Sequence, residues 1–212
     1  MTATARNRIK FALAGNAFEL VNPLIPGGPH AEVVRRAGEV PITTALELCA
    51  GTGYAARLLA MAHPLARVFA LDASPEMLAV GRRKLAGARL DNVTLVHGDA
   101  AALEFADSSV DVVMSVFGMH ELPTSVRRRA VTECARVLRP GGRFVAVDID
   151  RPPGPAGLVV DAYLLAAEPR DARDVLGAGL ADLLADEGFA IDSWSPATTL
   201  RPTQAITARR PG

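Results

Sequence analysis

Short apolar runs alternate along the chain with segments whose apolar residues recur at helical spacing. Runs that are apolar almost throughout are typical of strands covered on both faces, whereas helical spacing indicates an amphipathic helix. The predicted strands are residues 44–49, 67–71, 93–97, 110–116 and 143–149. The helices predicted among them are residues 54–61, a helix capped by Ser74 that begins at Pro75, and residues 124–138. After residue 150 the pattern predicts a helix over residues 173–187 and two strands, residues 189–194 and 204–208.

This alternation predicts the class of fold. Strands that alternate with helices form βαβ units, in which successive strands run parallel. We therefore expect a single α/β domain: a doubly wound, mostly parallel sheet of seven strands with helices on both faces. We divide it into an N-terminal helical cover (1–40), a central core (41–150), and a C-terminal helix with the last strands (151–212). A stretch rich in Pro and Gly, residues 22–30, separates the first amphipathic segment from a short helix over residues 31–38.

The composition limits the classes of function. The chain has 212 residues with 23 basic and 23 acidic side chains, so its formal net charge is zero. A neutral chain lacks the basic surface typical of nucleic-acid binding, and no apolar run approaches the ~18 residues that cross a bilayer. Two distant cysteines exclude a disulfide framework, and the histidines are too scattered for a metal site. We expect a cytoplasmic protein with a small-molecule partner, no metal, no nucleic acid and no integral membrane association.

Candidate binding residues gather where the predicted strands end. Gly51 and Gly53 lie between the first strand and the following helix, where glycine allows the backbone to approach a ligand closely. Asp72 follows Gly53 by 19 residues and lies at the tip of the next strand, and Asp99 follows the third strand. A carboxylate at the position of Asp72 can accept hydrogen bonds from both hydroxyls of a ribose. In an open α/β sheet ligands bind at these strand ends, so the pattern predicts a nucleoside-shaped ligand.

A dinucleotide is the competing ligand. Gly51, Gly53 and Ala56 have the spacing of the dinucleotide fingerprint, and Asp72 fits its acidic residue. Glu47 argues against it, because a carboxylate late in the first strand would repel a pyrophosphate and attract a cation. We also find no pair of residues suited to hydride transfer. A dinucleotide-dependent oxidoreductase therefore remains the less favoured hypothesis.

The same residues resemble the first motif of the class I S-adenosylmethionine-dependent methyltransferases. That motif, acidic-x-Gly-x-Gly-x-Gly, is similar to residues 47–53, with Cys49 in place of its first glycine. Asp72 matches the family's ribose-binding acid, Asp99 with Ala100 its adenine-binding pair, and residues 138–142 its late LRPGG turn. The resemblance implies S-adenosylmethionine as the cofactor. The residues expected to bind it are Glu47, Cys49, Ala50, Gly51, Thr52, Gly53, Asp72, Ala73, Met77, Asp99, Ala100, Val116 and Phe117.

A narrower resemblance concerns the N-terminal segment. Residues 17–25 and the Gly28-Pro-His30 sequence look like the start of the C-methyltransferases of menaquinone and ubiquinone biosynthesis. In this chain Phe18 and Glu19 replace the Tyr-Asp pair of that family. The resemblance implies an aromatic or quinol-like acceptor. It also implies that Phe18 and His30 belong to a lid over the acceptor.

The loop after the fourth strand carries the candidate catalytic residues. His120 lies where a general base would face the transferred methyl group, and Glu121 can orient it or contact the acceptor. Two other hypotheses stay open: His120 only shapes the pocket, or the protein binds S-adenosylmethionine without transferring its methyl group. We expect Arg127 and the two arginines that follow it to form a solvated helix face.

Overall fold

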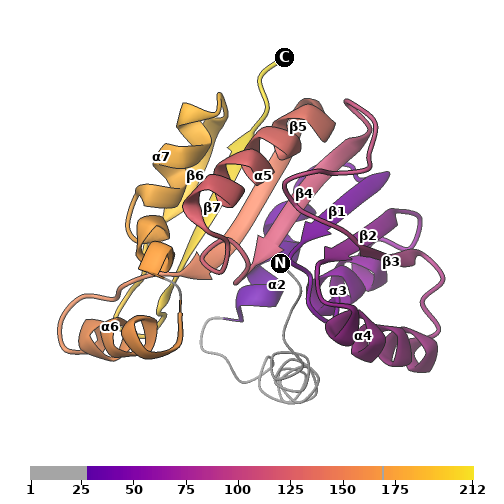
Figure 1. Ribbon diagram of the computed structural model, residues 1–212. Helices are drawn as coiled ribbons and strands as arrows, with labels where there is room; N and C mark the ends of the chain where they lie inside the picture. The colour runs from indigo at the N-terminus through magenta and orange to yellow at the C-terminus, as the bar shows by residue number, and fades with distance from the viewer. Residues whose placement is uncertain (1–27, 169) are drawn as a thin grey trace.

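The computed structural model describes residues 28–168 and 170–212, which form one seven-stranded sheet with helices on both faces (Figure 1). The strands are β1 (Thr44–Leu48), β2 (Arg67–Asp72), β3 (Val93–His97), β4 (Val110–Val116), β5 (Leu138–Ile149), β6 (Ala190–Ser195) and β7 (Thr203–Arg209). The helices are α2 (Pro29–Ala37), α3 (Tyr54–Ala62), α4 (Pro75–Ala88), α5 (Thr124–Val137), α6 (Ala156–Ala167), the 3₁₀ helix η2 (Arg170–Val175) and α7 (Gly179–Asp186). The predicted fold class is confirmed.

The strand order is β3-β2-β1-β4-β5-β7-β6, and β7 is antiparallel to both of its neighbours. All five residues of β1 are buried, and Leu46 pairs with Phe69 of β2 on one side and Val113 of β4 on the other. From β1 the chain runs outward to β3 and then returns to β4 on the opposite side. Such a reversal of strand order opens a crevice at the carboxyl ends of the strands. The candidate residues follow the strands that border this crevice.

Two hydrophobic cores cover the two faces of the sheet. Leu46 and Leu48 of β1 pack in the core that contains α5 and α7, and Ala45 packs in the core that contains α2 and α3. This division follows from the alternation of side chains along a strand, which places neighbouring residues on opposite faces. The central strands are therefore buried on both sides, as their apolar sequences predict.

Most predicted elements are confirmed to within a residue or two. The hydroxyl of Ser74 caps α4 by accepting a hydrogen bond from the Met77 amide, and Pro75 is its first residue. Strand β5 begins earlier than predicted, at Leu138, which pairs with Val110. The pairing then shifts register between Val110 and Val112, because the Pro-Gly-Gly turn inserts extra residues into the strand.

The C-terminal part differs from the sequence prediction. The single helix predicted over residues 173–187 is wrong: η2 ends at Val175, Gly177 adopts a left-handed φ of +57°, and α7 begins only at Gly179. Helix α6 was not predicted, because its apolar residues do not follow a helical stripe. Leu158, Val159 and Leu165 remain largely exposed on it. No helix in the described part of the chain is both long and apolar enough to span a membrane.

Candidate active site

The turn between β1 and α3 is built from backbone in the left-handed region. Cys49, Gly51 and Gly53 have φ of +52°, +55° and +69°. Glu47 is 3% exposed and lies beneath the turn, where its carboxylate accepts a hydrogen bond of 2.8 Å from the Ala56 amide in the first turn of α3. Burial raises the pKa of Glu47 to about 8. Glu47 therefore supports the turn from below, mostly as a neutral acid at pH 7, and the repulsion of a pyrophosphate expected from its charge is weakened.

Asp72 at the end of β2 is fastened to this turn. One carboxylate oxygen accepts a hydrogen bond of 2.6 Å from the Gly51 amide, and the other accepts one of 2.7 Å from the Ser74 amide. Burial raises the pKa of Asp72, although these two amides oppose the rise by stabilising the ionised form. A Cβ atom on Gly51 would lie 3.1 Å from the terminal methyl of Met77, so glycine keeps this approach open.

Asp99 lies beyond β3, one strand further out than Asp72. Its carboxylate accepts a hydrogen bond of 2.9 Å from the Ala101 amide, a local turn that leaves Asp99 exposed and Ala100 buried. His97 at the end of β3 contacts the carbonyl of Ala73 at 3.2 Å, which ties the two strand ends together. The three predicted carboxylates thus occupy the ends of neighbouring strands: Glu47 is buried, Asp72 half-buried and Asp99 exposed.

The end of β4 touches the glycine turn directly. A Cβ atom on Gly118 would lie 2.5 Å from Cβ of Cys49, so only glycine fits between these two loops. Phe117 adopts a left-handed φ of +55°, a conformation that is costly for an aromatic residue and typical of functional sites. Its ring lies 6.2 Å from that of His30 in α2, which is also 5.0 Å from the ring of Tyr54. His30 is therefore brought to the crevice; Phe18 lies outside the described residues.

His120 is buried and paired with Asp148, a residue that the sequence analysis missed. Nδ1 of His120 lies 2.5 Å from Oδ1 of Asp148, and Oδ2 of Asp148 accepts hydrogen bonds from the amides of Met119 and His120. Burial alone would lower the pKa of His120, but the charge and hydrogen bond of Asp148 outweigh it, so the pKa is raised. The sequence carried one signal for Asp148, because it is the only carboxylate in β5 and interrupts the apolar run that follows Arg143.

Two further carboxylates surround the outer nitrogen of this histidine. Oε2 of Glu168, at the end of α6, lies 3.9 Å from Nε2 of His120. The other oxygen of Glu168 accepts a hydrogen bond of 2.5 Å from the Tyr163 hydroxyl. Glu121 reaches solvent, yet its pKa is raised to about 7, chiefly by loss of hydration and further by Glu168. Tyr163 lies in the unpredicted helix α6 and Glu168 directly follows it, so no local sequence signal pointed to them.

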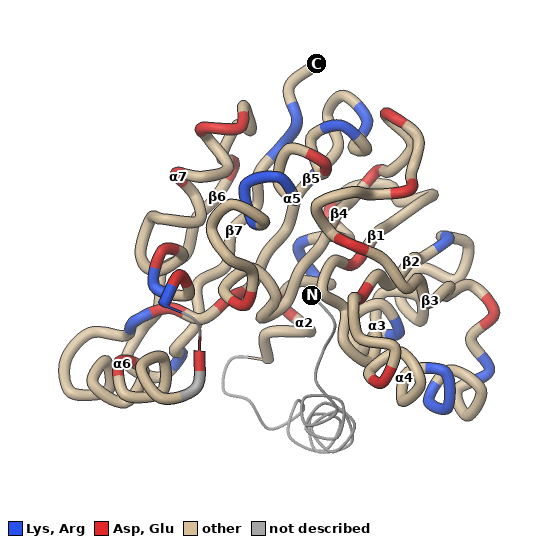
Figure 2. Tube along the Cα trace, viewed as in Figure 1, with Lys and Arg blue, Asp and Glu red and all other residues tan. Residues whose placement is uncertain are grey.

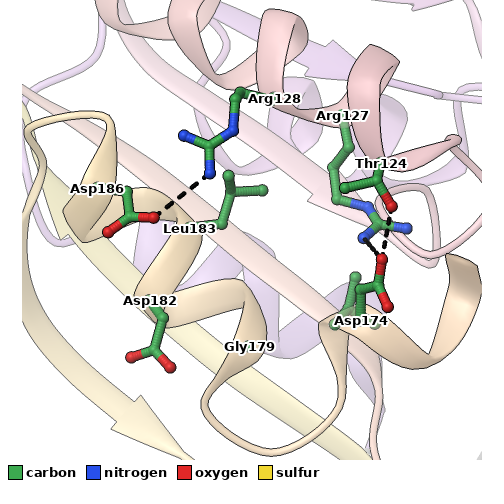
Figure 3. A pocket seen from close by; sticks show the side chains of 9 residues that line it. Thr124, Arg127, Arg128, Asp174, Gly179, Asp182, Leu183 and Asp186 are labelled. Carbon is green, nitrogen blue, oxygen red and sulfur yellow. Dashed lines mark hydrogen bonds and ion pairs between the residues drawn. The ribbon is translucent and has the colours of Figure 1, made fainter.

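The prediction that Arg127 lies on a solvated helix face is wrong. It is 1% exposed, and its guanidinium donates to the carbonyls of Met119, Leu122 and Asp171 at 2.7–2.8 Å. It therefore holds both ends of the loop that carries His120. Figure 3 shows Arg127 beside Thr124 and Asp174 in a recess between α5 and α7. Along the described residues basic and acidic positions are interspersed (Figure 2).

The class of protein is defined by four features: the strand order, the antiparallel strand β7, the glycine turn and Asp72. Together they identify a Rossmann-like methyltransferase fold. A solved S-adenosylmethionine-dependent methyltransferase from Aquifex aeolicus matches with a TM-score of 0.73 and 18% identity, over 96% of this chain and 98% of that one. The cyclase SpnF matches with a TM-score of 0.71 and 19% identity, over 94% and 96%. One fold thus carries different named activities.

The chain belongs to the class I S-adenosylmethionine-dependent methyltransferases. A family profile described as a methyltransferase domain matches residues 45–142. The demethylmenaquinone methyltransferase of Thermus thermophilus is 38% identical over 151 residues, which cover 69% of this chain and 67% of that protein. Its counterpart in Halalkalibacterium halodurans is 32% identical over 159 residues, covering 72% and 64%. S-adenosylmethionine is the cofactor of this family, as the motif predicts, which favours it over a dinucleotide.

The matches do not extend over the full length of every relative. The chain spans 46% of the length of the Shouchella clausii relative and 64% of the one from Halalkalibacterium halodurans. Both of those relatives are named demethylmenaquinone methyltransferases. Family membership therefore rests on the core that contains the glycine turn and the strand ends.

Proposed function

We propose that this protein transfers a methyl group from S-adenosylmethionine to a small aromatic acceptor that carries a hydroxyl group, of the quinol type. The names of the demethylmenaquinone methyltransferases support the acceptor class. The observation that carries the proposal is the buried pair of His120 and Asp148, because the loop that carries His120 touches the cofactor turn through Gly118 and Cys49. This contact supports His120 as a candidate base beside the proposed donor site.

The residues of the turn fit the cofactor, because the left-handed backbone at Gly51 and Gly53 forms a tight turn without side chains at the carboxyl end of β1, where a ligand can approach the main chain closely. Bound S-adenosylmethionine supplies a methyl group on a positively charged sulfur. Asp72 would accept hydrogen bonds from the ribose hydroxyls, and Asp99 with Ala100 would contact the adenine. The remaining predicted contacts are Cys49, Ala50, Thr52, Ala73, Met77, Val116 and Phe117. Glu47 holds the turn in place from beneath.

His120 is suited to take a proton from the acceptor. Because Asp148 accepts the Nδ1–H hydrogen bond, the lone pair of the neutral imidazole lies on Nε2. The hydroxyl proton of the acceptor moves to Nε2, and its electron pair stays on the acceptor, which becomes the stronger nucleophile. Asp148 then stabilises the imidazolium. A positioned base of this kind contributes roughly 10²–10⁴-fold in rate.

Two other residues contribute to the acceptor side of the proposal. Glu121 follows the base in the same loop and would contact the acceptor hydroxyl. His30 packs edge-on against Tyr54 and Phe117, so it would form part of the wall. Phe18 remains a predicted lid residue.

The test is a turnover assay by mass spectrometry. The full chain and S-adenosylmethionine are mixed with a 1,4-naphthohydroquinone, with simple phenols and with amines, and methylated products and S-adenosylhomocysteine are measured. We expect a methylated hydroquinone, and a loss of at least a hundredfold in kcat for His120→Gln. His63→Gln, at the far end of α3, is the matched control and keeps the rate.

Other outcomes separate the hypotheses. Turnover of phenols or amines alone would discard the quinol acceptor and keep methyl transfer. An unchanged rate for His120→Gln would remove the base. If S-adenosylmethionine binds in a calorimetric titration and no acceptor is methylated, the protein is a binding protein and the proposal fails.

A further inference from the structure

We propose that His120, Glu121 and Glu168 form a binding site for a divalent transition-metal ion such as Zn²⁺. Each residue offers one ligand atom, and the three atoms lie within 4.8 Å of one another. The residues come from two segments, the loop after β4 and the end of α6, that converge beside the carboxyl ends of the central strands. No motif in the sequence groups them.

His120 is already oriented as a metal ligand. Its side chain is 5% exposed, Asp148 holds Nδ1 at 2.5 Å, and Nε2 points at Oε2 of Glu168, 3.9 Å away. Among the described residues Nε2 has no hydrogen-bond partner. A carboxylate behind a histidine is the usual support of metal-bound imidazole, since it fixes the ring and raises its basicity. A ring held on one side by Asp148 and facing Glu168 with its other nitrogen, with a Glu121 oxygen in the same cluster, has the geometry of a cation ligand.

With the two glutamates the site has three protein ligands, and a tetrahedral ion would keep its fourth coordination position open. Tyr163 holds one oxygen of Glu168, which leaves the other directed at His120. Two ligands of one tetrahedral zinc lie roughly 3.3 Å apart, given metal–ligand distances near 2.0–2.2 Å. Nε2 and Oε2 must therefore approach by well under one ångström. A water molecule or an acceptor hydroxyl would fill the remaining position.

The charge of the cluster favours a cation of this class. In the part of the chain that the structure describes, neither Glu121, Glu168 nor Asp148 forms an ion pair with a lysine or arginine. An ion of charge +2 would neutralise carboxylates that now repel one another. One imidazole with two carboxylates suits zinc, manganese or cobalt, whereas magnesium and calcium prefer ligands that are all oxygen. The sequence predicted no metal because the histidines are scattered, but this site needs only one.

The ion would inhibit methyl transfer, and this consequence rests on the proposed function. Nε2 of His120 cannot hold a metal and accept the proton of the acceptor at the same time. Zinc and the acceptor therefore compete for one nitrogen. Metal binding itself does not depend on the reaction, so it can be tested without donor or acceptor.

The experiment is a calorimetric titration of the full chain with Zn²⁺, with Co²⁺ as a spectroscopic probe of coordination geometry. We expect one ion per chain, and an affinity at least tenfold lower for Glu168→Gln and for His120→Gln. Glu187→Gln, a glutamate that pairs with Arg128 on the outer side of α5, is the matched control and should bind as the wild type does. Circular dichroism melts establish that each variant is folded.

Three outcomes decide the proposal. Loss of binding in Glu168→Gln alongside an intense tetrahedral Co²⁺ spectrum in the wild type supports it. Equal affinity in Glu168→Gln and Glu187→Gln overturns it, because the ion would then bind elsewhere. If zinc binds as expected but does not inhibit an active enzyme, the site stands and the competition with the base is wrong. A failure of turnover with every acceptor would affect only the proposed function.

Discussion

The donor side and the acceptor side of the crevice are built in different ways. On the donor side, at the ends of β1 to β3, carboxylates are satisfied by backbone amides: Asp72 by Gly51 and Ser74, and Glu47 by Ala56. On the acceptor side, Asp148 also accepts from backbone amides, but side chains in addition meet other side chains and distant carbonyls. His120 meets Asp148 across 28 positions of the chain, and Arg127 reaches Asp171 across 44.

We infer from this difference that the donor side serves the binding of S-adenosylmethionine and the acceptor side serves the reaction. Amides of a turn have one arrangement, so the donor side presents a fixed surface once the strands are formed. Burial raises carboxylate pKa values on both sides, but on the acceptor side the pKa values of His120 and Glu121 also respond to each other and to Asp148 and Glu168, so their charges depend on one another and on what is bound. We therefore expect substitutions on the donor side to change affinity for S-adenosylmethionine, and substitutions on the acceptor side to change the rate.

The largest effect is expected at the base. Asp148→Asn leaves the shape of the site intact but cannot accept the Nδ1–H hydrogen bond as a carboxylate does. We expect kcat to fall roughly 10²–10⁴-fold, with affinity for S-adenosylmethionine within twofold. Steady-state kinetics and a binding titration measure the two. Asp192→Asn, an exposed residue paired with Arg209, is the control, and a similar loss of rate there would refute the role of Asp148.

The loop that carries the base is expected to depend on Arg127. Arg127→Met leaves three carbonyls without their donor and should lower the free energy of unfolding by about 3–5 kcal/mol. For a chain of this size, each kcal/mol shifts Tm by about 2–4 °C. Thermal melts measure the shift. Arg129→Met, on the exposed side of the same helix, should leave Tm unchanged. Equal melts for both variants would contradict a structural role for Arg127.

The loop after β4 packs against the glycine turn at Gly118, and a larger residue at this position should destabilise the protein. Gly118→Ala places a methyl group 2.5 Å from Cβ of Cys49 and 2.9 Å from Oγ of Ser115, which should cost about 1–3 kcal/mol of stability. A second substitution, Cys49→Gly, removes the first clash and should recover part of the loss. Gly87→Ala meets nothing within 4 Å and is the control. Denaturant titrations compare the four chains, and an absence of rescue would show that the two loops do not touch.

The most gradual effect concerns pH. Because the pKa of Glu47 rises from about 4.5 when unfolded to about 8 when folded, folding takes up a proton between these values. The contribution of Glu47 to stability therefore falls as pH rises from about 4.5 to 8, by up to about 1.4 kcal/mol per pH unit, and does not change outside this window. Glu47→Gln should flatten that part of the curve. Glu104→Gln, an exposed residue, should keep the slope. Parallel curves for both variants would place the titration elsewhere.

The same difference explains what the sequence could predict. The glycine turn, the cap at Ser74 and the acid at Asp72 are local patterns, so they could be read from neighbouring residues. His120 was found because it follows a strand. The roles of Asp148 and Arg127 became visible only when the chain was folded, since Asp148 meets His120 across 28 positions and Arg127 turns inward to backbone carbonyls that no side-chain pattern marks. Helix α6, with Glu168, was missed because its exposed apolar residues give no amphipathic stripe.

The measurement that tests the separation of the two sides is a double-mutant cycle with Asp72→Asn and Asp148→Asn. Affinity for S-adenosylmethionine and kcat are measured for the four chains under one condition. We predict that Asp72→Asn weakens binding about 10–100-fold without Asp148→Asn adding to it, and that the combined free energies are the sum of the single ones within about 0.5 kcal/mol. If Asp148→Asn weakens donor binding as strongly, or the cycle shows coupling above about 1 kcal/mol, the two sides form one site and the account is contradicted.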